Sequence, residues 1–186
     1  MNRRDALTRV SLLFGGALIG SDAFLSGCSR REEKAMNGMA FTDHQVLFLN
    51  EVGETILPAT AESPGAKEAR VGEFMNTIVT DCYTADDQKI ILEGIGIIEQ
   101  RSGTEYKREF LKLTDGERLQ LLNTIDKEAK NKDSSKHYFT MMKQLTVWGY
   151  FTSEVGSTKA LRYVPIPGRY EGCIPYTKGD GVWADI

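Results

Sequence analysis

Apolar residues recur at the spacing of an amphipathic α-helix over about a hundred residues, between Thr42 and Glu154. A helix with one apolar stripe has to bury that stripe against other elements. Several such segments follow one another, and polar or proline-containing stretches separate them. The pattern predicts an all-α fold: a single small helical domain of about five helices with an irregular C-terminal tail rich in Pro, Gly and aromatic residues.

Capping residues mark the expected helix ends. Thr42 with Gln45 and Thr114 with Glu117 form capping boxes, and Pro58 stops the first helix. The last strong helix is expected over about 135–154. The residues expected to face the core are Val46, Leu49, Val52 and Ile56; Val71, Phe74, Met75, Ile78, Val79 and Cys82; Leu119, Leu122, Ile125 and Ala129; and Tyr138, Met141, Met142, Leu145, Trp148 and Phe151. For the last of these faces, partner contact is the alternative to the core.

The segment that begins at Thr84 differs from the others because residues 90–98 are apolar nearly all round. A helix of that kind is expected at the centre of a domain. Gly94 and Gly96 each weaken a helix by up to about 1 kcal/mol, or they allow another helix to approach closely.

After Gly156 the composition changes. Prolines within 164–176 impose extended backbone geometry, and tyrosine, tryptophan and arginine are enriched at protein interfaces. The alternative is a tail that lies on its own domain. The expected partner-binding residues are Arg169, Tyr170, Pro175, Tyr176 and Trp183.

The first 27 residues have the plan of a secretion signal. Arg3 and Arg4 precede a short uncharged stretch over 10–21, which is about half the roughly 20 residues needed to span a bilayer. The arginine pair favours the twin-arginine route for folded proteins, with the general route as the alternative. Cys28 follows Leu-Ser-Gly as in a lipobox, so a lipid at Cys28 is expected to anchor the chain on the periplasmic side of a membrane. Residues 28–40 are expected to be a tether, and 41–186 the helical domain.

The remaining chain keeps 20 of the 23 basic and 24 of the 26 acidic residues, because Arg3, Arg4, Arg9, Asp5 and Asp22 belong to the leader. This balance argues against a nucleic-acid partner, which would need a basic stripe. In an oxidising compartment Cys82 and Cys173 are expected to form a disulfide with each other or with another chain, or Cys82 is a buried free thiol.

Motifs for chemistry are scarce. His44 and His137 lie in different predicted helices without ligands at metal spacing, so no metal site is expected. Gly94-Ile95-Gly96 lacks the third glycine of a dinucleotide fingerprint. The sequence therefore predicts a chain without redox chemistry of its own, whose activity belongs to a partner. A hydrolase with two acids facing one cleft is a third, weaker alternative.

The chain resembles the gluconate 2-dehydrogenase subunit 3 family. The resembling features are the leader with Arg3 and Arg4, 54–60 (Glu-Thr-Ile-Leu-Pro-Ala-Thr), 63–66 (Ser-Pro-Gly-Ala), 150–156 (Tyr-Phe-Thr-Ser-Glu-Val-Gly), 163–175 and 181–184 (Gly-Val-Trp-Ala).

The resemblance implies a non-catalytic small subunit that binds, helps fold and co-exports a large flavin-dependent dehydrogenase of the glucose-methanol-choline type. The FAD would belong to that partner, which oxidises a sugar or sugar acid and passes electrons to a cytochrome c or another carrier. In some relatives a late cysteine before a proline links the two subunits, and Cys173 occupies a similar place. The rival interpretation is a stand-alone periplasmic lipoprotein that binds a sugar or an envelope partner.

Overall fold

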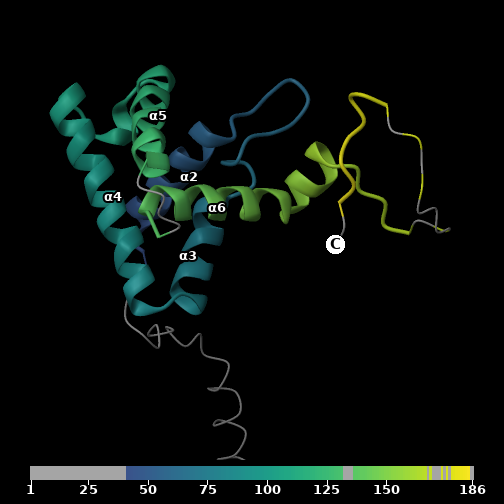
Figure 1. Ribbon diagram of the computed structural model, residues 1–186, viewed down its shortest axis with the longest axis horizontal. Helices are drawn as coiled ribbons and strands as arrows, with labels where there is room; N and C mark the ends of the chain where they lie inside the picture. Colours follow the sequence, from purple (N-terminus) through teal and green to yellow (C-terminus); the bar gives the residue numbers. More distant parts are fainter. Residues whose placement is uncertain are drawn as a thin grey trace, which may run out of the picture. The chain divides into compact units, whose positions relative to one another are not determined.

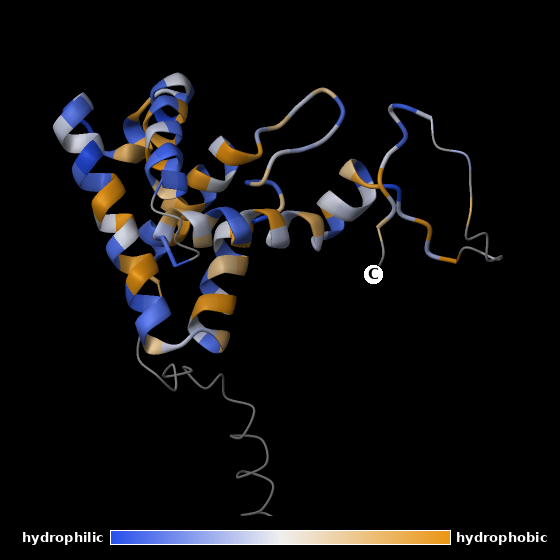
Figure 2. Cartoon of the chain, viewed as in Figure 1, coloured by the Kyte–Doolittle hydropathy of each residue, from blue (hydrophilic) through white to orange (hydrophobic). Residues whose placement is uncertain are grey.

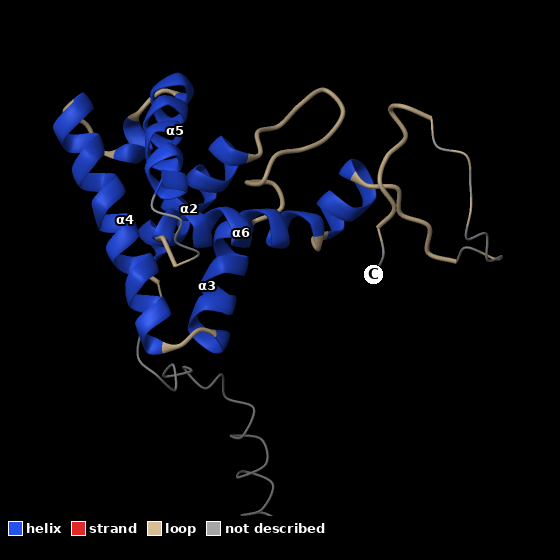
Figure 3. Cartoon of the chain, in the orientation of Figure 1, coloured by secondary structure: helices blue, strands red, loops and turns tan. Residues whose placement is uncertain are grey.

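The computed structural model describes residues 41–131, 136–166, 168, 173, 175 and 177–184 (Figure 1). Its elements are α2 (Asp43–Ile56), α3 (Val71–Cys82), α4 (Ala85–Tyr106), the 3₁₀-helix η1 (Phe110–Lys112), α5 (Asp115–Asn131), α6 (Tyr138–Phe151) and the π-helix η2 (Gly156–Ala160). No strand occurs among the described residues (Figure 3). The predicted all-α fold with an irregular tail is confirmed.

Both predicted capping boxes form. The Thr42 N–H donates to Gln45 Oε1 at 2.9 Å, and the Gln45 N–H donates back to Thr42 Oγ1 at 3.3 Å. Helix α2 ends at Ile56, before Pro58. The hydrogen bond from the Thr114 N–H lowers the pKa of the Glu117 carboxyl. The stabilisation that the Glu117 carboxylate adds to the second box is therefore present at neutral pH and is lost as the pH falls through that lowered pKa.

Helix α6 is the centre of the domain, because it packs against α2, α3, α4 and α5 (Figure 1). Eight of its residues are buried, which leaves only a narrow face for solvent. The largest fully buried side chains of the described core are Phe48, Phe110, Leu49, Met75, Ile91, Ile98, Leu121, Ile125, Met142, Leu145, Val52 and Val71.

The expectation that α4 is central and apolar all round was wrong. Only one stripe of α4 is buried, at Ile91, Gly94, Ile95, Ile98 and neighbouring polar positions, whereas Ile97 is exposed. Figure 2 shows apolar and polar stretches alternating along this helix. Helix α4 packs on α6, α3 and η1 from one side, so its other face meets solvent.

The two glycines of α4 give a matched test of packing. A Cβ on Gly94 would lie 2.6 Å from the Cβ and ring of Tyr138, whereas a Cβ on Gly96 would meet nothing within 4 Å. Gly94→Ala is expected to destabilise the domain by about 1–3 kcal/mol, because Tyr138 Cβ cannot move without shifting α6. Gly96→Ala is expected to stabilise it by up to about 1 kcal/mol through helix propensity.

Urea unfolding of the chain without its first 40 residues measures both effects. Equal shifts of the two midpoints in the same direction would contradict the close crossing of α4 and α6 at Gly94.

The core-facing prediction for α5 was partly wrong. Leu122, Ile125 and Ala129 are buried as predicted, but Leu119 is exposed and Leu121 takes its place. The side of α5 toward the core begins at Arg118, because Arg118, not Leu119, reaches inward to η1, where it donates to the Leu111 carbonyl at 2.8 Å.

Candidate functional site

The leader residues Arg3 and Arg4, the lipidation residue Cys28, and the tail residues Arg169, Tyr170 and Tyr176 lie outside the described residues. Those predictions are untested by the structure. The described members of the predicted set are Cys82, Cys173, Pro175 and Trp183.

The two cysteines are free and exposed, and they are not joined to each other in the structure. The placement of Cys82 at the end of a buried face was wrong. Instead of Cys82, Gln88 fills this end of α3, where its amide donates to the carbonyls of Val79 at 2.9 Å and Tyr83 at 3.3 Å. Tyr83 packs against the core, and Cys82 is exposed.

Trp183 is 41% exposed in the tail, and other apolar side chains of the tail are exposed as well. Val182 is 72% exposed and Ile166 is 85% exposed, and Tyr163 and Val164 are also exposed. Figure 2 shows apolar stretches between polar ones along this part of the chain. The described tail therefore presents apolar surface to its surroundings instead of adding it to the core.

Helix α6 carries a second exposed aromatic residue. The face of α6 with Trp148 was predicted to be core, with partner contact as the alternative, and Trp148 is 50% exposed. Phe74 of α3 takes the inward place: it lies against Gly149 and meets the Trp148 ring edge-on, with centroids 5.2 Å apart. Trp148 is thus an exposed indole held on a rigid helix, the kind of residue that anchors protein interfaces.

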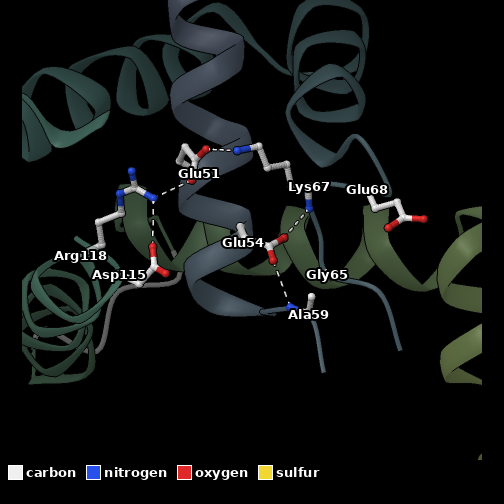
Figure 4. A pocket seen from close by; sticks show the side chains of 8 residues that line it. All are labelled: Glu51, Glu54, Ala59, Gly65, Lys67, Glu68, Asp115 and Arg118. Atoms are coloured by element: carbon white, nitrogen blue, oxygen red, sulfur yellow. Dashed lines mark hydrogen bonds and ion pairs between the residues drawn. The ribbon is translucent and has the colours of Figure 1, made fainter. Parts of the chain in front are cut away.

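A polar pocket of about 550 Å³ lies between α2, the 57–70 loop and α5 (Figure 4). Glu51 pairs with Lys67 and, at 2.7 Å, with Arg118, which also approaches Asp115 at 3.5 Å. The Glu51 and Arg118 side chains are 15% and 12% exposed. Each buried charge is therefore paired, and this pairing ties α2 to α5.

Glu54 holds the 57–70 loop in the same pocket (Figure 4). Its carboxylate accepts the Ala59 N–H at 3.0 Å and the Lys67 N–H at 2.8 Å. A Cβ on Gly65 would collide with the Glu54 carboxylate, so a side chain at position 65 would displace it.

Two segments that are distant in the sequence meet at this loop. The Tyr150 hydroxyl donates to the Pro64 carbonyl at 2.6 Å. The hydrogen bond between Tyr150 and Pro64 thus links residues 54–66 to residues 150–156. Their contacts fix the loop and the end of α6, from which η2 and the tail continue.

The two histidines lie at the starts of helices. Nδ1 of His137 accepts the Phe139 N–H at 3.2 Å at the start of α6, and His44 is exposed in the first turn of α2. No group of three or more His, Cys, Asp or Glu residues in the described part of the chain is placed to hold a metal ion. None of the helices described is long and apolar enough to cross a membrane.

A model of the family "gluconate 2-dehydrogenase subunit 3" matches residues 43–168. The match spans the helical domain from α2 through η2 and includes both segments that meet at the 57–70 loop. The chain belongs to this family, as the sequence resemblance predicted. Searches of curated proteins and of solved structures found no match.

Sequence reasoning favoured the core for Trp148 and missed the contact of Arg162 with Trp183. Trp148 fits a helical stripe by spacing, and only the position of Phe74 shows that it faces outward. Arg162, which contacts Trp183 across the tail, lies 21 positions before it, so no local pattern indicates the contact.

Proposed function

We propose that this chain is the non-catalytic small subunit of a periplasmic, flavin-dependent sugar or sugar-acid dehydrogenase. The observation that carries the proposal is the family match over the whole helical domain. The partner is a large subunit of the glucose-methanol-choline type that holds the FAD. It passes electrons to a cytochrome c or another carrier.

The exposed aromatic and apolar side chains support a binding role. Trp148 stands on α6, and Ile166, Val182 and Trp183 stand on the tail. Tryptophan contributes strongly to binding energy when a partner desolvates it. The two sites are connected through η2, which packs against α6. The large subunit is proposed to cover both.

The polar groups support a non-catalytic role for this chain. In the pocket of Figure 4, the carboxylates of Glu51 and Glu54 are engaged by cations or backbone amides that hold the fold together. A general acid or base needs a proton-transfer partner in a substrate, and these groups are committed to other contacts. Oxidation of the sugar is therefore assigned to the partner and its FAD.

The leader and the cysteines complete the proposal. Arg3 and Arg4 would export the partner with its cofactor already bound, because the twin-arginine route carries folded proteins. A lipid on Cys28 would anchor the complex at the membrane on its periplasmic side. The Cys173 thiol, exposed and unpaired with Cys82, is free to form an interchain disulfide with the large subunit.

Exchanging the leader tests the anchor and the partner together. Residues 1–28 are replaced by a twin-arginine leader that ordinary signal peptidase cleaves without lipid attachment. Dye-linked sugar dehydrogenase activity is expected to move from the membrane fraction to the soluble periplasmic fraction, because the lipid is the proposed attachment.

The unaltered chain is the control, and its activity should leave the membrane with detergent but not with salt. Activity that stays in the membrane after the exchange would contradict the lipid anchor. Activity that is the same with and without this chain would contradict the subunit role.

A further inference from the structure

The tail crosses itself at one point, where Arg162 and Trp183 form a contact that we name the clasp. The Arg162 N–H donates to the Val182 carbonyl at 2.8 Å, and the Ala184 N–H donates to the Arg162 carbonyl at 3.1 Å. These bonds form an isolated parallel bridge between Arg162 and Trp183. The guanidinium carbon of Arg162 lies 4.2 Å from the centre of the Trp183 ring. Backbone and side chains thus hold the same two positions together.

The clasp is attached to the helical core at one end. Arg162 follows Leu161, whose N–H donates to the Gly156 carbonyl at 3.1 Å and closes η2. Helix η2 packs against α6, the central helix. Trp183 lies beyond the residues that the family model matches, so the clasp joins a matched residue to an unmatched one.

Apolar side chains flank the clasp on both of the tail segments that it joins. Tyr163, Val164 and Ile166 follow Arg162, and Val182 precedes Trp183; all four are exposed. Single exposed apolar residues are ordinary on protein surfaces, but several gathered around one crossing point mark an interaction site. Because the clasp already joins the two segments, a partner that binds them does not have to order them first.

The charge of the tail favours a protein surface over a lipid surface as its binding partner. Residues 161–186 contain three basic residues, Arg162, Arg169 and Lys178, and three acidic residues, Glu171, Asp180 and Asp185. Attachment to an anionic membrane surface depends on an excess of lysine and arginine. A balanced tail with apolar side chains around a pinned crossing fits the apolar surface of a protein.

We propose that Arg162 is a positioning residue that holds Trp183, and with it Val182, in the arrangement that docks on an apolar surface of the large dehydrogenase subunit. This inference rests on the proposed function, which supplies the partner. Arg162 acts through Trp183, so its effect on docking depends on the presence of that indole.

A double-mutant cycle tests the dependence. Tagged full-length chains carrying Arg162→Ala, Trp183→Ala or both changes are produced in the native host, and the affinity of each for the flavin subunit is measured in mild detergent. Each single variant is expected to bind the flavin subunit about tenfold less tightly than the unaltered chain. The double variant is expected to bind only slightly less tightly than the single variant with the larger loss. Arg162→Lys keeps a cation over the ring and should retain most of the affinity.

Lys178→Ala is the matched control, because Lys178 is an exposed tail cation outside the clasp. Its affinity should equal that of the unaltered chain. The melting temperature of every variant should also be unchanged, because Arg162 and Trp183 lie outside the helical core. A lower melting temperature that parallels the affinity would assign Arg162 to folding and overturn the positioning role.

Additive losses for the two single changes would show independent contacts and overturn the clasp. Unchanged affinity in Arg162→Ala would overturn it as well. If the variants at Arg162 and Trp183 lose binding to phosphatidylglycerol vesicles but keep their affinity for the flavin subunit, the clasp would be assigned to lipid binding instead. An unaltered chain that captures no flavoprotein would overturn the proposed function itself, a result distinct from all of these.

Discussion

Replacing Arg3 and Arg4 together by lysine is expected to leave the dehydrogenase subunit in the cytoplasm. Lysine keeps the positive charge but not the planar guanidinium with its five donors, so the exchange removes the recognised groups without changing the charge of the leader. The large subunit is proposed to travel on this leader after it has folded around its FAD, so it would have no other route. Periplasmic dye-linked dehydrogenase activity should fall by at least about tenfold.

Cell fractionation with an immunoblot of the large subunit measures this result, and the cytoplasmic fraction should gain what the periplasm loses. Arg9→Lys in the same leader is the matched control, because Arg9 stands outside the pair. A large subunit that reaches the periplasm normally in the Arg3→Lys, Arg4→Lys chain would contradict the carrier role.

Phe110→Ala is expected to have the largest effect on the fold. The Phe110 side chain is fully buried, its ring centre is 4.8 Å from that of Phe48, and the Arg118 guanidinium lies 5.8 Å from the ring centre. Removal of a buried phenylalanine side chain costs about 3–5 kcal/mol, because the cavity closes only partly. A domain of this size has a total stability of about 5–15 kcal/mol, so the variant should unfold at much lower urea concentration.

Leu119→Ala provides the comparison, since Leu119 is an exposed apolar residue on the adjacent helix α5. It is expected to change the free energy of unfolding by less than about 0.5 kcal/mol. Similar losses in the two variants would contradict the role of Phe110 as a core residue that joins η1 to α2.

Phe110 also shows where prediction from the sequence ends. The helices were predictable because their signals are local: Thr42 with Gln45, Thr114 with Glu117, and Pro58 act on neighbouring residues. Phe110 lies in a three-residue 3₁₀-helix, which is too short to show a period. Its burial depends on the contacts of η1 with α4 and α2, and no residue near it in the sequence reveals them.

The same limit explains the errors within the helices. A helical stripe gives the direction of the core only approximately, so Trp148 and Leu119 were placed inside when they are exposed. The apolar run in α4 suggested burial on all sides, but the helix has neighbours on one side only. The burial of such residues depends on how many elements surround a helix, and the spacing of apolar residues in the sequence does not give the number of those neighbours.

The candidate binding surface was predictable in composition and not in geometry. Tyrosine, tryptophan and proline in the tail indicated an interface, and Trp183 is exposed there. Its contact with Arg162 joins residues that are distant in sequence, as does the hydrogen bond between Tyr150 and Pro64. Long-range contacts of this kind are set by the folded backbone.

An affinity pull-down of the tagged full-length chain from its native membrane, with an absorbance scan of the eluate, tests the subunit role most directly. The account predicts a yellow eluate with a flavin spectrum and a second, larger chain that reduces a dye in the presence of a sugar or sugar acid. A colourless eluate that contains this chain alone, under detergent conditions mild enough to preserve membrane complexes, would contradict it.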